Sequence, residues 1–349
     1  MEKKLIHLDH LFADPNWEGP EIIYGTHLIK EATNTTERYA VMTMEIPWGL
    51  VKDDVVKQPE AVLYVPNTHL STFEALEAQV PEGVEMVIGI GGGSSHDAAK
   101  FVAIKRQIRL LQFPTIFGGD SVVCSAVGLR EERRVKYIGH SRAEKVYVDF
   151  DVIRKAPPQL VRYGASDILS SYTALMDWEY AASKGKAQML DDAYNYAKNT
   201  LLPRLINNAA EINQLTNQGI KTMVDLFMEY AKLANRNNTD RAQEGSEHFV
   251  AYNAEYVTRR TFVHGSLLSM GIYIVGSYFY DKHDEIDRLL NEMGQQHTLK
   301  SFCLSADETR ETLRTLQKFV HDGNYYHSIV HDVALSDAEI EAIIRDISK

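Results

Sequence analysis

The sequence predicts an α/β domain with a parallel sheet, followed by an all-helical domain. Up to about residue 150, short apolar runs rich in β-branched residues alternate with helical stretches. A glycine-rich turn joins one such run to a helix, and a helical period covers most of the remaining chain. The chain has 349 residues, which is long enough for two domains and too long for one ordinary core.

Short apolar runs in the first half read as strands. Strands that are separated by helices imply βαβ units and therefore a parallel sheet, whose ligands bind at the carboxyl ends of the strands. The segments Gly91–Asp97 and Thr115–Asp120 stand at such ends. The predicted strands outside the glycine-rich unit are Glu21–Gly25, Tyr39–Met44, Ala61–Val65, Gln112–Ile116 and Val146–Phe150, and the helix between the first two looks truncated.

The segment Met86–Lys100 reads Met-Val-Ile-Gly-Ile-Gly-Gly-Gly-Ser-Ser-His-Asp-Ala-Ala-Lys. Its apolar start predicts a buried strand, and the residues from Ala98 onward predict a helix. Glycine lets a ligand approach the backbone closely, and a helix N-terminus offers free N–H groups with positive partial charge. We therefore expect an anion site, most naturally for a diphosphate; a tight turn before a helix is the alternative. The spacing matches neither Gly-x-Gly-x-x-Gly nor a P-loop.

The composition changes after Asp151, and Pro157-Pro158 marks a boundary. We expect an α/β nucleotide domain at residues 1–156 and an all-helical domain at residues 157–349, with the active site in the cleft between them. Ser336-Asp337-Ala338-Glu339 predicts a capping box before a terminal helix. The predicted helical segments before it are Ala165–Ala182, Ala187–Ile212, Lys221–Ala234 and Ala254–Tyr280.

Three polar residues of the helical half, Asp167, His248 and His264, stand in apolar surroundings. One carboxylate and two imidazoles suit a divalent ion such as Zn²⁺, Ni²⁺ or Fe²⁺, with positions left for a substrate. A histidine on an apolar helix is also a common core residue, so the residues alone leave both interpretations open.

Bulk properties exclude several classes of partner. A formal net charge of −11 argues against nucleic acid and anionic membranes, because both need a basic surface. We find neither a signal peptide nor a run of about 18 apolar residues that could span a bilayer. Cys124 and Cys303 form no disulfide framework, so both are expected to be reduced. We expect a cytoplasmic protein.

Three motifs, in order along the chain, carry a resemblance to a known family. The pattern Ser94-x-x-Asp97-x-x-Lys100 after three glycines resembles the signature of the metal-dependent, iron-type alcohol dehydrogenase superfamily. Ala156–Trp178, Gly245-Ser246-Glu247-His248 and His264-Gly265 are similar to its glycerol-1-phosphate dehydrogenase branch. The similarity runs from about residue 86 to the C-terminus and is faint before that.

The resemblance implies NAD or NADP as cofactor and one divalent metal (Zn, Ni or Fe) held by Asp167, His248 and His264. Asp120 is implied to lie near the substrate and nicotinamide, with a turn aspartate as the alternative, and Asp167 and Tyr252 to contact substrate. A homo-oligomer is also implied. The residues that the resemblance assigns to the cofactor are Gly91, Gly92, Gly93, Ser94, Ser95, Asp97, Thr115, Gly118 and Cys124.

The implied reaction is hydride transfer between a small polyol or alcohol, phosphorylated in part of the family, and its ketone or aldehyde. Tyr252 stands where the branch carries a substrate-contacting histidine, so a related sugar, polyol or phosphorylated or phosphonylated alcohol is an alternative to glycerol-1-phosphate itself. Cys124 replaces a serine of the family, and His96 replaces an apolar residue. Proton relay through water, Asp120 or His96 stays open. Glu45 is either a ribose ligand that favours NAD or a solvated glutamate.

Two other functions remain. Dehydroquinate-synthase-like sugar-phosphate cyclases resemble this chain in layout, but their first metal ligand is usually glutamate. They also present several basic residues to a substrate phosphate, for which the candidates here are Arg162, Arg259 and Arg260. Net accumulation of NADH would separate a dehydrogenase from a cyclase. The third interpretation is a metal- or nucleotide-binding relative that has lost enzymatic activity. The presence of all three ligand residues and of the glycine turn argues against it.

Overall fold

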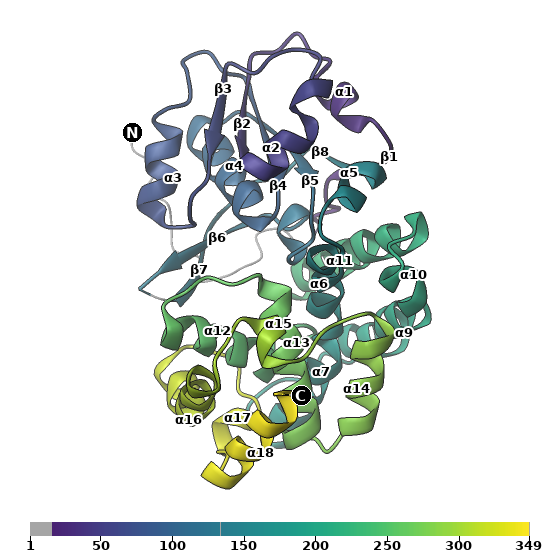
Figure 1. Ribbon diagram of the computed structural model, residues 1–349, viewed down its shortest axis with the longest axis vertical. Coiled ribbons are helices and arrows are strands. Elements are labelled where there is room, and N and C mark those ends of the chain that lie inside the picture. Colours follow the sequence, from purple (N-terminus) through teal and green to yellow (C-terminus); the bar gives the residue numbers. More distant parts are fainter. Residues whose placement is uncertain (1–15, 133, 349) are drawn as a thin grey trace. The chain divides into compact units, whose positions relative to one another are not determined.

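The computed structural model describes residues 16–132 and 134–348 (Figure 1). Contacts divide the chain into two compact units, one ending at Val161 and the other beginning at Arg162. This division lies close to the boundary expected between residues 156 and 157; as functional domains, 1–156 and 157–349 stay a prediction.

The first unit is built on a six-stranded sheet in which every neighbouring pair is parallel, as the sequence predicts (Figure 1). The strand order is β1-β8-β5-β4-β2-β3. All six residues of the central strand β4 are buried, because apolar clusters cover both faces of the sheet. The strands are β1 (Glu21–Gly25), β2 (Tyr39–Thr43), β3 (Ala61–Tyr64), β4 (Met86–Gly91), β5 (Arg109–Pro114) and β8 (Lys145–Asp149).

Helices and one antiparallel hairpin complete this unit. The hairpin of β6 (Ala126–Glu131) and β7 (Arg134–His140) was not expected, because charged residues interrupt its apolar alternation. Val127, Leu129 and Ile138 nevertheless pack into the core on the α4 side of the sheet. The helices are α1 (Leu28–Thr33), α2 (Glu45–Val51), α3 (Leu70–Glu77), α4 (Gly93–Arg106) and α5 (Phe150–Lys155), with 3₁₀ turns η1 (Lys52–Asp54) and η2 (Asp120–Val122).

From Pro158 onward all the described elements are helices, as predicted. The capping box at Ser336 is confirmed: Glu339 N donates to Ser336 Oγ at 3.3 Å, and Ser336 N donates to Glu339 Oε2 at 2.7 Å. The helices are α6 (Pro158–Leu169), α7 (Ser171–Ser183), α8 (Asp191–Tyr196), α9 (Leu202–Asn207), α10 (Ala209–Asn213), α11 (Asn217–Asn237), α12 (Ser246–Thr258), α13 (His264–Ile274), α14 (His283–Glu292), α15 (Leu299–Phe302), α16 (Ala306–Asp322), α17 (Ile329–Asp332) and α18 (Asp337–Ile347), with π-helical turns η3 (Ala197–Leu201) and η4 (Val275–Phe279).

Three helical segments expected to be continuous are interrupted, so those predictions were wrong. Ala165–Ala182 breaks at Ser170, whose hydroxyl donates to Asp167 O at 2.6 Å. Ala187–Ile212 divides into three α-helices and one π-helical turn. Ala254–Tyr280 breaks after Thr258, because Arg259 adopts a left-handed φ of 57° that ends α12. The chain then turns before α13 begins at His264.

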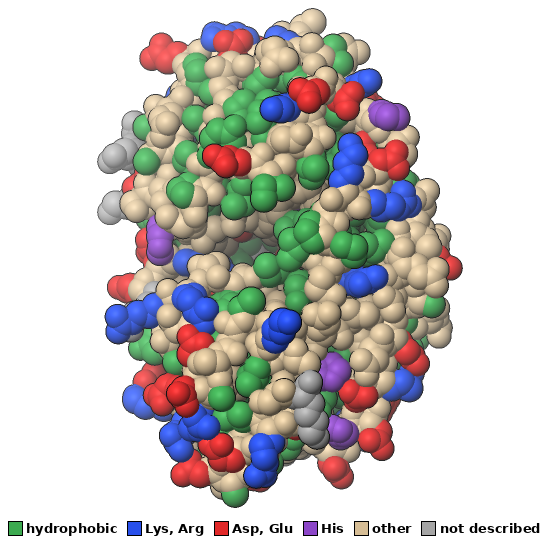
Figure 2. All heavy atoms as spheres, viewed as in Figure 1, with side chains coloured by type: hydrophobic (Ala, Val, Ile, Leu, Met, Phe, Trp, Pro, Cys, Tyr) green, Lys and Arg blue, Asp and Glu red, His purple; other side chains and the backbone are tan. Residues whose placement is uncertain are grey.

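No helix in the described part of the chain is long and apolar enough to cross a membrane. On the face drawn in Figure 2, Lys and Arg side chains are interspersed with Asp and Glu rather than gathered into a patch of one sign.

Candidate metal and cofactor sites

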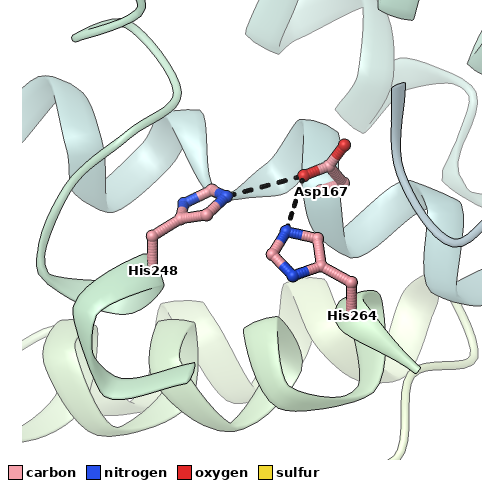
Figure 3. Close-up of side chains that lie close together, drawn as sticks. All are labelled: Asp167, His248 and His264. Carbon is pink, nitrogen blue, oxygen red and sulfur yellow. Dashed lines mark ion pairs between the residues drawn. The ribbon is translucent and has the colours of Figure 1, made fainter. Parts of the chain in front are cut away.

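Asp167 on α6, His248 on α12 and His264 at the start of α13 meet at one point. Asp167 Oδ1 lies 3.7 Å from His248 Nε2 and 3.6 Å from His264 Nε2. The two imidazole rings are 5.2 Å apart, and Figure 3 shows both turned toward the carboxylate. One ligand atom from each residue lies within 4.8 Å of the others. One oxygen and two imidazole nitrogens that converge in this way fit a divalent ion.

The surroundings of these residues favour a positive charge. Asp167 and His248 are buried, and His264 is half-buried. Burial by itself raises the pKa of Asp167, but the neighbouring His248 and His264 imidazoles outweigh it and hold that pKa below its usual value. Burial lowers the pKa of His248, yet Glu244, Asp167 and Glu247 together raise it well above its usual value. A cation at this point therefore meets several acidic groups.

Glu247, which precedes His248, fixes the direction of the imidazole. Its side chain is fully buried, and Oε1 lies 3.0 Å from His248 Nδ1 and accepts from Gly245 N at 2.8 Å. Thr173 Oγ1 donates to Oε2 at 2.7 Å. A carboxylate that accepts from Nδ1–H leaves Nε2 as the nitrogen that faces Asp167 and that can bind a metal ion. The sequence motif contains Glu247, but nothing in its spacing revealed this role.

The start of α12 is anchored by Asp177 on α7. Oδ2 of Asp177 accepts from Ser246 N at 2.6 Å, while Oδ1 accepts from Tyr280 OH at 2.6 Å and from Ile329 N at 3.0 Å. Burial raises the pKa of Asp177 to about 6. One carboxyl group thus joins the starts of α12 and α17 to α7 and fixes the residues that precede His248.

Two glycines allow α13 to pack closely against its neighbours. A Cβ on Gly265 would overlap the carbonyl oxygen of Tyr163 on α6, and a Cβ on Gly271 would overlap that of Glu247 on α12. The backbones of the three helices that carry the candidate ligands can therefore approach only because these positions have no side chain.

Glu244 and Tyr252 lie beside the candidate metal ligands. Glu244 Oε2 is 3.8 Å from His248 Nε2 and accepts from Tyr252 OH at 3.3 Å. The Tyr252 ring stacks on the His264 ring, with centroids 6.2 Å apart. Burial raises the pKa of the Glu244 carboxyl to about 8. Sequence analysis identified Tyr252 as a candidate but not Glu244. Glu244 lies near His248 only because of the way the chain turns before α12.

In the first unit, the glycine turn connects β4 to α4. The helix begins at Gly93 rather than Ala98, so the predicted start was wrong and Gly93–Asp97 form the first helical turns. Gly91 has a φ of 145°, and a Cβ there would lie 2.6 Å from Ser95 Oγ. The turn follows β4 where the strand order reverses between β2 and β4, which is the usual ligand position in such sheets.

Neighbouring residues support this turn. Thr115 N donates to Gly91 O at 2.9 Å, and Thr43 Oγ1 donates to Ile90 O at 2.8 Å. A Cβ on Gly92 would lie 2.9 Å from Ile116 Cγ1, whereas no atom lies within 4 Å of a Cβ built on Gly118. These contacts make Gly91 and Gly92 steric requirements of the turn and leave Gly118 with open space beside it.

Buried side chains lie beneath the first turns of α4. Lys100 is 1 % exposed; its Nζ lies 2.9 Å from Asp97 Oδ1 and 3.5 Å from Cys124 Sγ, and it donates to Ala126 O at 2.7 Å. Burial raises the pKa of the Cys124 thiol. Asp97 therefore has a protein cation as partner, and Cys124 contacts that cation.

The other predicted cofactor and catalytic residues of this unit lie close by along the chain. Ser94 is half-buried on α4, and Ser95 is fully buried beneath Gly91. Asp120 begins η2, where its carbonyl accepts from Cys124 N at 3.0 Å. Glu45 is exposed at the start of α2. Their roles toward cofactor and substrate stay predictions.

Comparison with known proteins agrees with these features. Residues 29–157 match the family model described as iron-containing alcohol dehydrogenase. The glycerol-1-phosphate dehydrogenase [NAD(P)+] of Pyrococcus horikoshii is 25% identical over 279 residues, which are 76% of this chain and 79% of the relative. The protein of the same name from Nitrosopumilus maritimus is 22% identical over 295 residues, 80% of this chain and 77% of that one.

Solved structures share the fold. The chain is similar to a probable glycerol dehydrogenase from Sinorhizobium meliloti 1021, with a TM-score of 0.69, 14% identity and coverage of 96% of this chain and 98% of that one. It is also similar to the NADH-dependent butanol dehydrogenase A of Thermotoga maritima, with a TM-score of 0.65, 16% identity and coverage of 97% and 100%.

Proposed function

We propose that this chain, which belongs to the iron-containing alcohol dehydrogenase superfamily, is an NAD(P)-dependent oxidoreductase that interconverts a small polyol or alcohol and its ketone or aldehyde. The observation that carries the proposal is the convergence of Asp167, His248 and His264 on one point. The names of the relatives make a phosphorylated polyol one candidate substrate. The proposed metal is Zn²⁺, Ni²⁺ or Fe²⁺.

The proposed metal ligands are Asp167 Oδ1 and the Nε2 atoms of His248 and His264. When bound there, a divalent ion would act as a Lewis acid on the alcohol oxygen, where negative charge develops as hydride leaves. Glu247 holds His248 in one orientation, and the close packing of α12 and α13 fixes the histidines relative to each other. Such rigid positioning lowers the barrier because no reorganisation is needed during the reaction.

For the cofactor, we propose the turn between β4 and α4. Gly92 and Gly93 are partly exposed after the buried Gly91, and the N-terminus of the 14-residue helix α4 provides positive partial charge for a diphosphate. Lys100, buried beneath the first turns, pairs with Asp97 and donates to Ala126 O, which anchors the start of the helix. Whether Glu45 selects NAD over NADP is part of the same proposal.

The first test combines elemental analysis with NADH and NADPH oxidation against a panel of carbonyl compounds that includes dihydroxyacetone and dihydroxyacetone phosphate. We expect about one divalent ion per chain, in line with the one set of three ligands found among the described residues, and turnover that stops on chelation. His264→Ala should lose both the metal and turnover while retaining cofactor binding. Full activity of the metal-free protein would refute the proposal.

Two of the three arginines that a sugar-phosphate cyclase would use to bind a substrate phosphate already contact other groups of the protein. Arg162 Nε donates to Asn213 O at 2.8 Å, and Arg260 pairs with Glu308 at 2.8 Å. These contacts favour the dehydrogenase over the cyclase. Stoichiometric conversion of NADH to NAD during turnover is the result expected of a dehydrogenase, whereas product formation without net change of the cofactor would indicate the cyclase.

A further inference from the structure

A serine and a histidine of the first unit form a hydrogen-bonded pair beside the β6–β7 hairpin. Ser125 Oγ lies 3.0 Å from His140 Nδ1, and Ser125 is 8% exposed. Ser141 N donates to Ser125 O at 2.9 Å, so the backbone of Ser125 is held as well as its side chain. Ser125 precedes β6, and His140 is the last residue of β7. The pair is therefore fixed at one end of the hairpin.

A β-bulge brings His140 to this position. Val127 pairs with Ile138, whereas the preceding residue Ala126 pairs with His140, so Gly139 is an extra residue in β7. Gly139 has a φ of 56°, a left-handed conformation that a residue without a Cβ adopts readily. Because side chains alternate between the two faces of a strand, one extra residue changes the face on which His140 lies. Bulges of this kind redirect single side chains, often beside functional sites.

The segment that carries Ser125 runs along α4, the helix of the proposed diphosphate site. Ser121 Oγ lies 3.1 Å from a Cβ built on Gly93, the first residue of α4. Further along the same helix, Lys100 Nζ donates to Ala126 O at 2.7 Å. Ser125 thus belongs to a segment that borders α4 on both sides of it in the sequence.

The order of the strands indicates which half of a dinucleotide this segment would meet. The glycine turn follows β4, which lies between β2 and β5 in the sheet. Glu45, the candidate ribose ligand of the adenosine half, follows β2 on one side, and the segment that leads to Ser125 follows β5 on the other. A diphosphate at the glycine turn would therefore direct the two nucleosides to opposite sides of β4. The nicotinamide nucleoside falls on the side of Ser125.

Cys124, the neighbour of Ser125, is less suited to a polar contact with the cofactor. Its thiol lies 3.5 Å from Lys100 Nζ and 3.8 Å from Ala126 O, and a thiol is a weak hydrogen-bonding group. The Ser125 hydroxyl can donate one hydrogen bond and accept others, and His140 takes up only one of them. The remaining capacity suits an uncharged group that can both donate and accept.

We infer that the Ser125 hydroxyl binds the nicotinamide nucleoside half of the cofactor, and that His140 is a positioning residue that orients this hydroxyl. The inference rests on the proposed function and adds Ser125 and His140 to its cofactor site. The bound group is uncharged, either a ribose hydroxyl or the carboxamide of the nicotinamide. Loss of the Ser125 hydroxyl should therefore weaken binding of the whole dinucleotide but spare fragments that lack this half.

Calorimetric titration with NADH, ADP-ribose and ADP tests the inference, because ADP-ribose lacks only the nicotinamide and ADP lacks its ribose as well. If NADPH binds more tightly than NADH, the 2′-phosphorylated forms of all three take their place. Ser125→Ala should raise the Kd of NADH by about tenfold, the effect of losing one hydrogen bond, and leave the Kd of ADP unchanged. A raised Kd of ADP-ribose would identify the ribose as the partner of Ser125, and an unchanged one the carboxamide.

Two variants of His140 test the positioning role. In His140→Leu, which offers no partner to Ser125 Oγ, the Kd of NADH should rise by up to about tenfold. His140→Asn places an amide near the position of Nδ1 and should restore part of the affinity. Both variants should bind ADP as the unmodified chain does. A purely structural role of His140 would instead weaken NADH and ADP alike.

Ser141→Ala is the matched control, because Ser141 is 9% exposed and lies at the same end of the hairpin as Ser125. It should leave the Kd of NADH unchanged. An unchanged Kd of NADH in Ser125→Ala, an equal rise in Ser141→Ala, or an equal loss of ADP affinity would overturn the inference while leaving the proposed function in place. Failure of the unmodified chain to bind NADH or NADPH would overturn the proposed function and the inference with it.

Discussion

At the scale of single residues, the direction of the His248 ring depends on one buried carboxyl group. The Glu247 carboxyl group accepts hydrogen bonds from Gly245 N and Thr173 Oγ1, and these hold it in the position where it contacts His248 Nδ1. Carboxylates in this position raise the basicity of a ligating histidine and set its tautomer. The structure therefore separates residues that would bind the metal from one that orients a ligand.

Glu247→Gln should lower metal affinity by about tenfold, and Glu247→Ala by more, because the amide oxygen of Gln still accepts from Nδ1–H and Ala offers no acceptor. Competition with a chelator of known affinity measures both. Partial rescue by Gln distinguishes orientation of His248 from a general packing role. Glu292→Gln, which removes an exposed carboxylate from α14, is the control. Equal metal affinity in Glu247→Ala and the unmodified chain would contradict this role.

Some residues of this site could be predicted from the sequence and others could not. Asp167, His248 and His264 were predictable as a set because the family resemblance connects three distant motifs, whereas the residues alone left them open. Glu244 was not predictable, since its approach to His248 depends on the turn before α12. Glu247 stood inside a recognised motif, but its contact with Thr173 on α7 is a tertiary feature without a sequence signal.

At the scale of elements, helix α4 carries an acid-sensitive residue in the core of the first unit. His96 is 1% exposed, and burial together with Lys100 lowers its pKa to about 3. The folded-state pKa lies below the usual value of about 6.5, so protons bind the unfolded chain more readily. The contribution of uncharged His96 to the free energy of unfolding is therefore fully present above a pH of about 6.5. It is lost progressively as the pH falls toward about 3.

Replacing His96 by Leu should flatten the fall of unfolding free energy between pH of about 6.5 and about 4, where this group contributes a slope of up to about 1.4 kcal/mol per pH unit. Denaturant unfolding at a series of pH values measures the slope for each protein. His69→Gln, which replaces an exposed histidine of the same unit, should keep the slope of the unmodified chain. An unchanged slope in His96→Leu would show that other groups cause the acid sensitivity.

The packing of α13 on α12 is the second element that the site requires. Because a Cβ on Gly271 would overlap the carbonyl oxygen of Glu247, Gly271→Ala should cost about 1–3 kcal/mol of unfolding free energy and weaken metal binding through displacement of α12. Gly49→Ala on α2 is the matched control, since nothing lies within 4 Å of its Cβ and alanine favours helix. Metal affinity unchanged in Gly271→Ala would contradict the dependence of the site on this contact.

The sequence predicted whether a segment is a helix or a strand better than it predicted where each element begins and ends. The parallel strands of the first unit followed from their apolar runs, and β4 was clearest because it is buried on both faces. Three helical segments of the second unit were predicted to be too long, because the apolar period continues through the breaks at Ser170 and Arg259; Arg259 ends α12 with a left-handed φ. The second of these breaks places His264 at the first position of α13.

At the scale of the whole molecule, the proposed cofactor and metal sites belong to different compact units, so each ligand should stabilise the chain independently of the other. A ligand at about 100 times its Kd adds about 2.7 kcal/mol to the free energy of unfolding. The thermal unfolding temperature of the unmodified chain should therefore rise with NAD or NADP and, separately, with Zn²⁺.

His264→Ala should lose the rise caused by the metal and keep the rise caused by the cofactor. Gly93→Val, whose Cβ would lie 3.1 Å from Ser121 Oγ at the proposed diphosphate position, should show the reverse. Loss of both shifts in either variant would mean that the two sites are not separable, and the assignment of one ligand to each unit would fall.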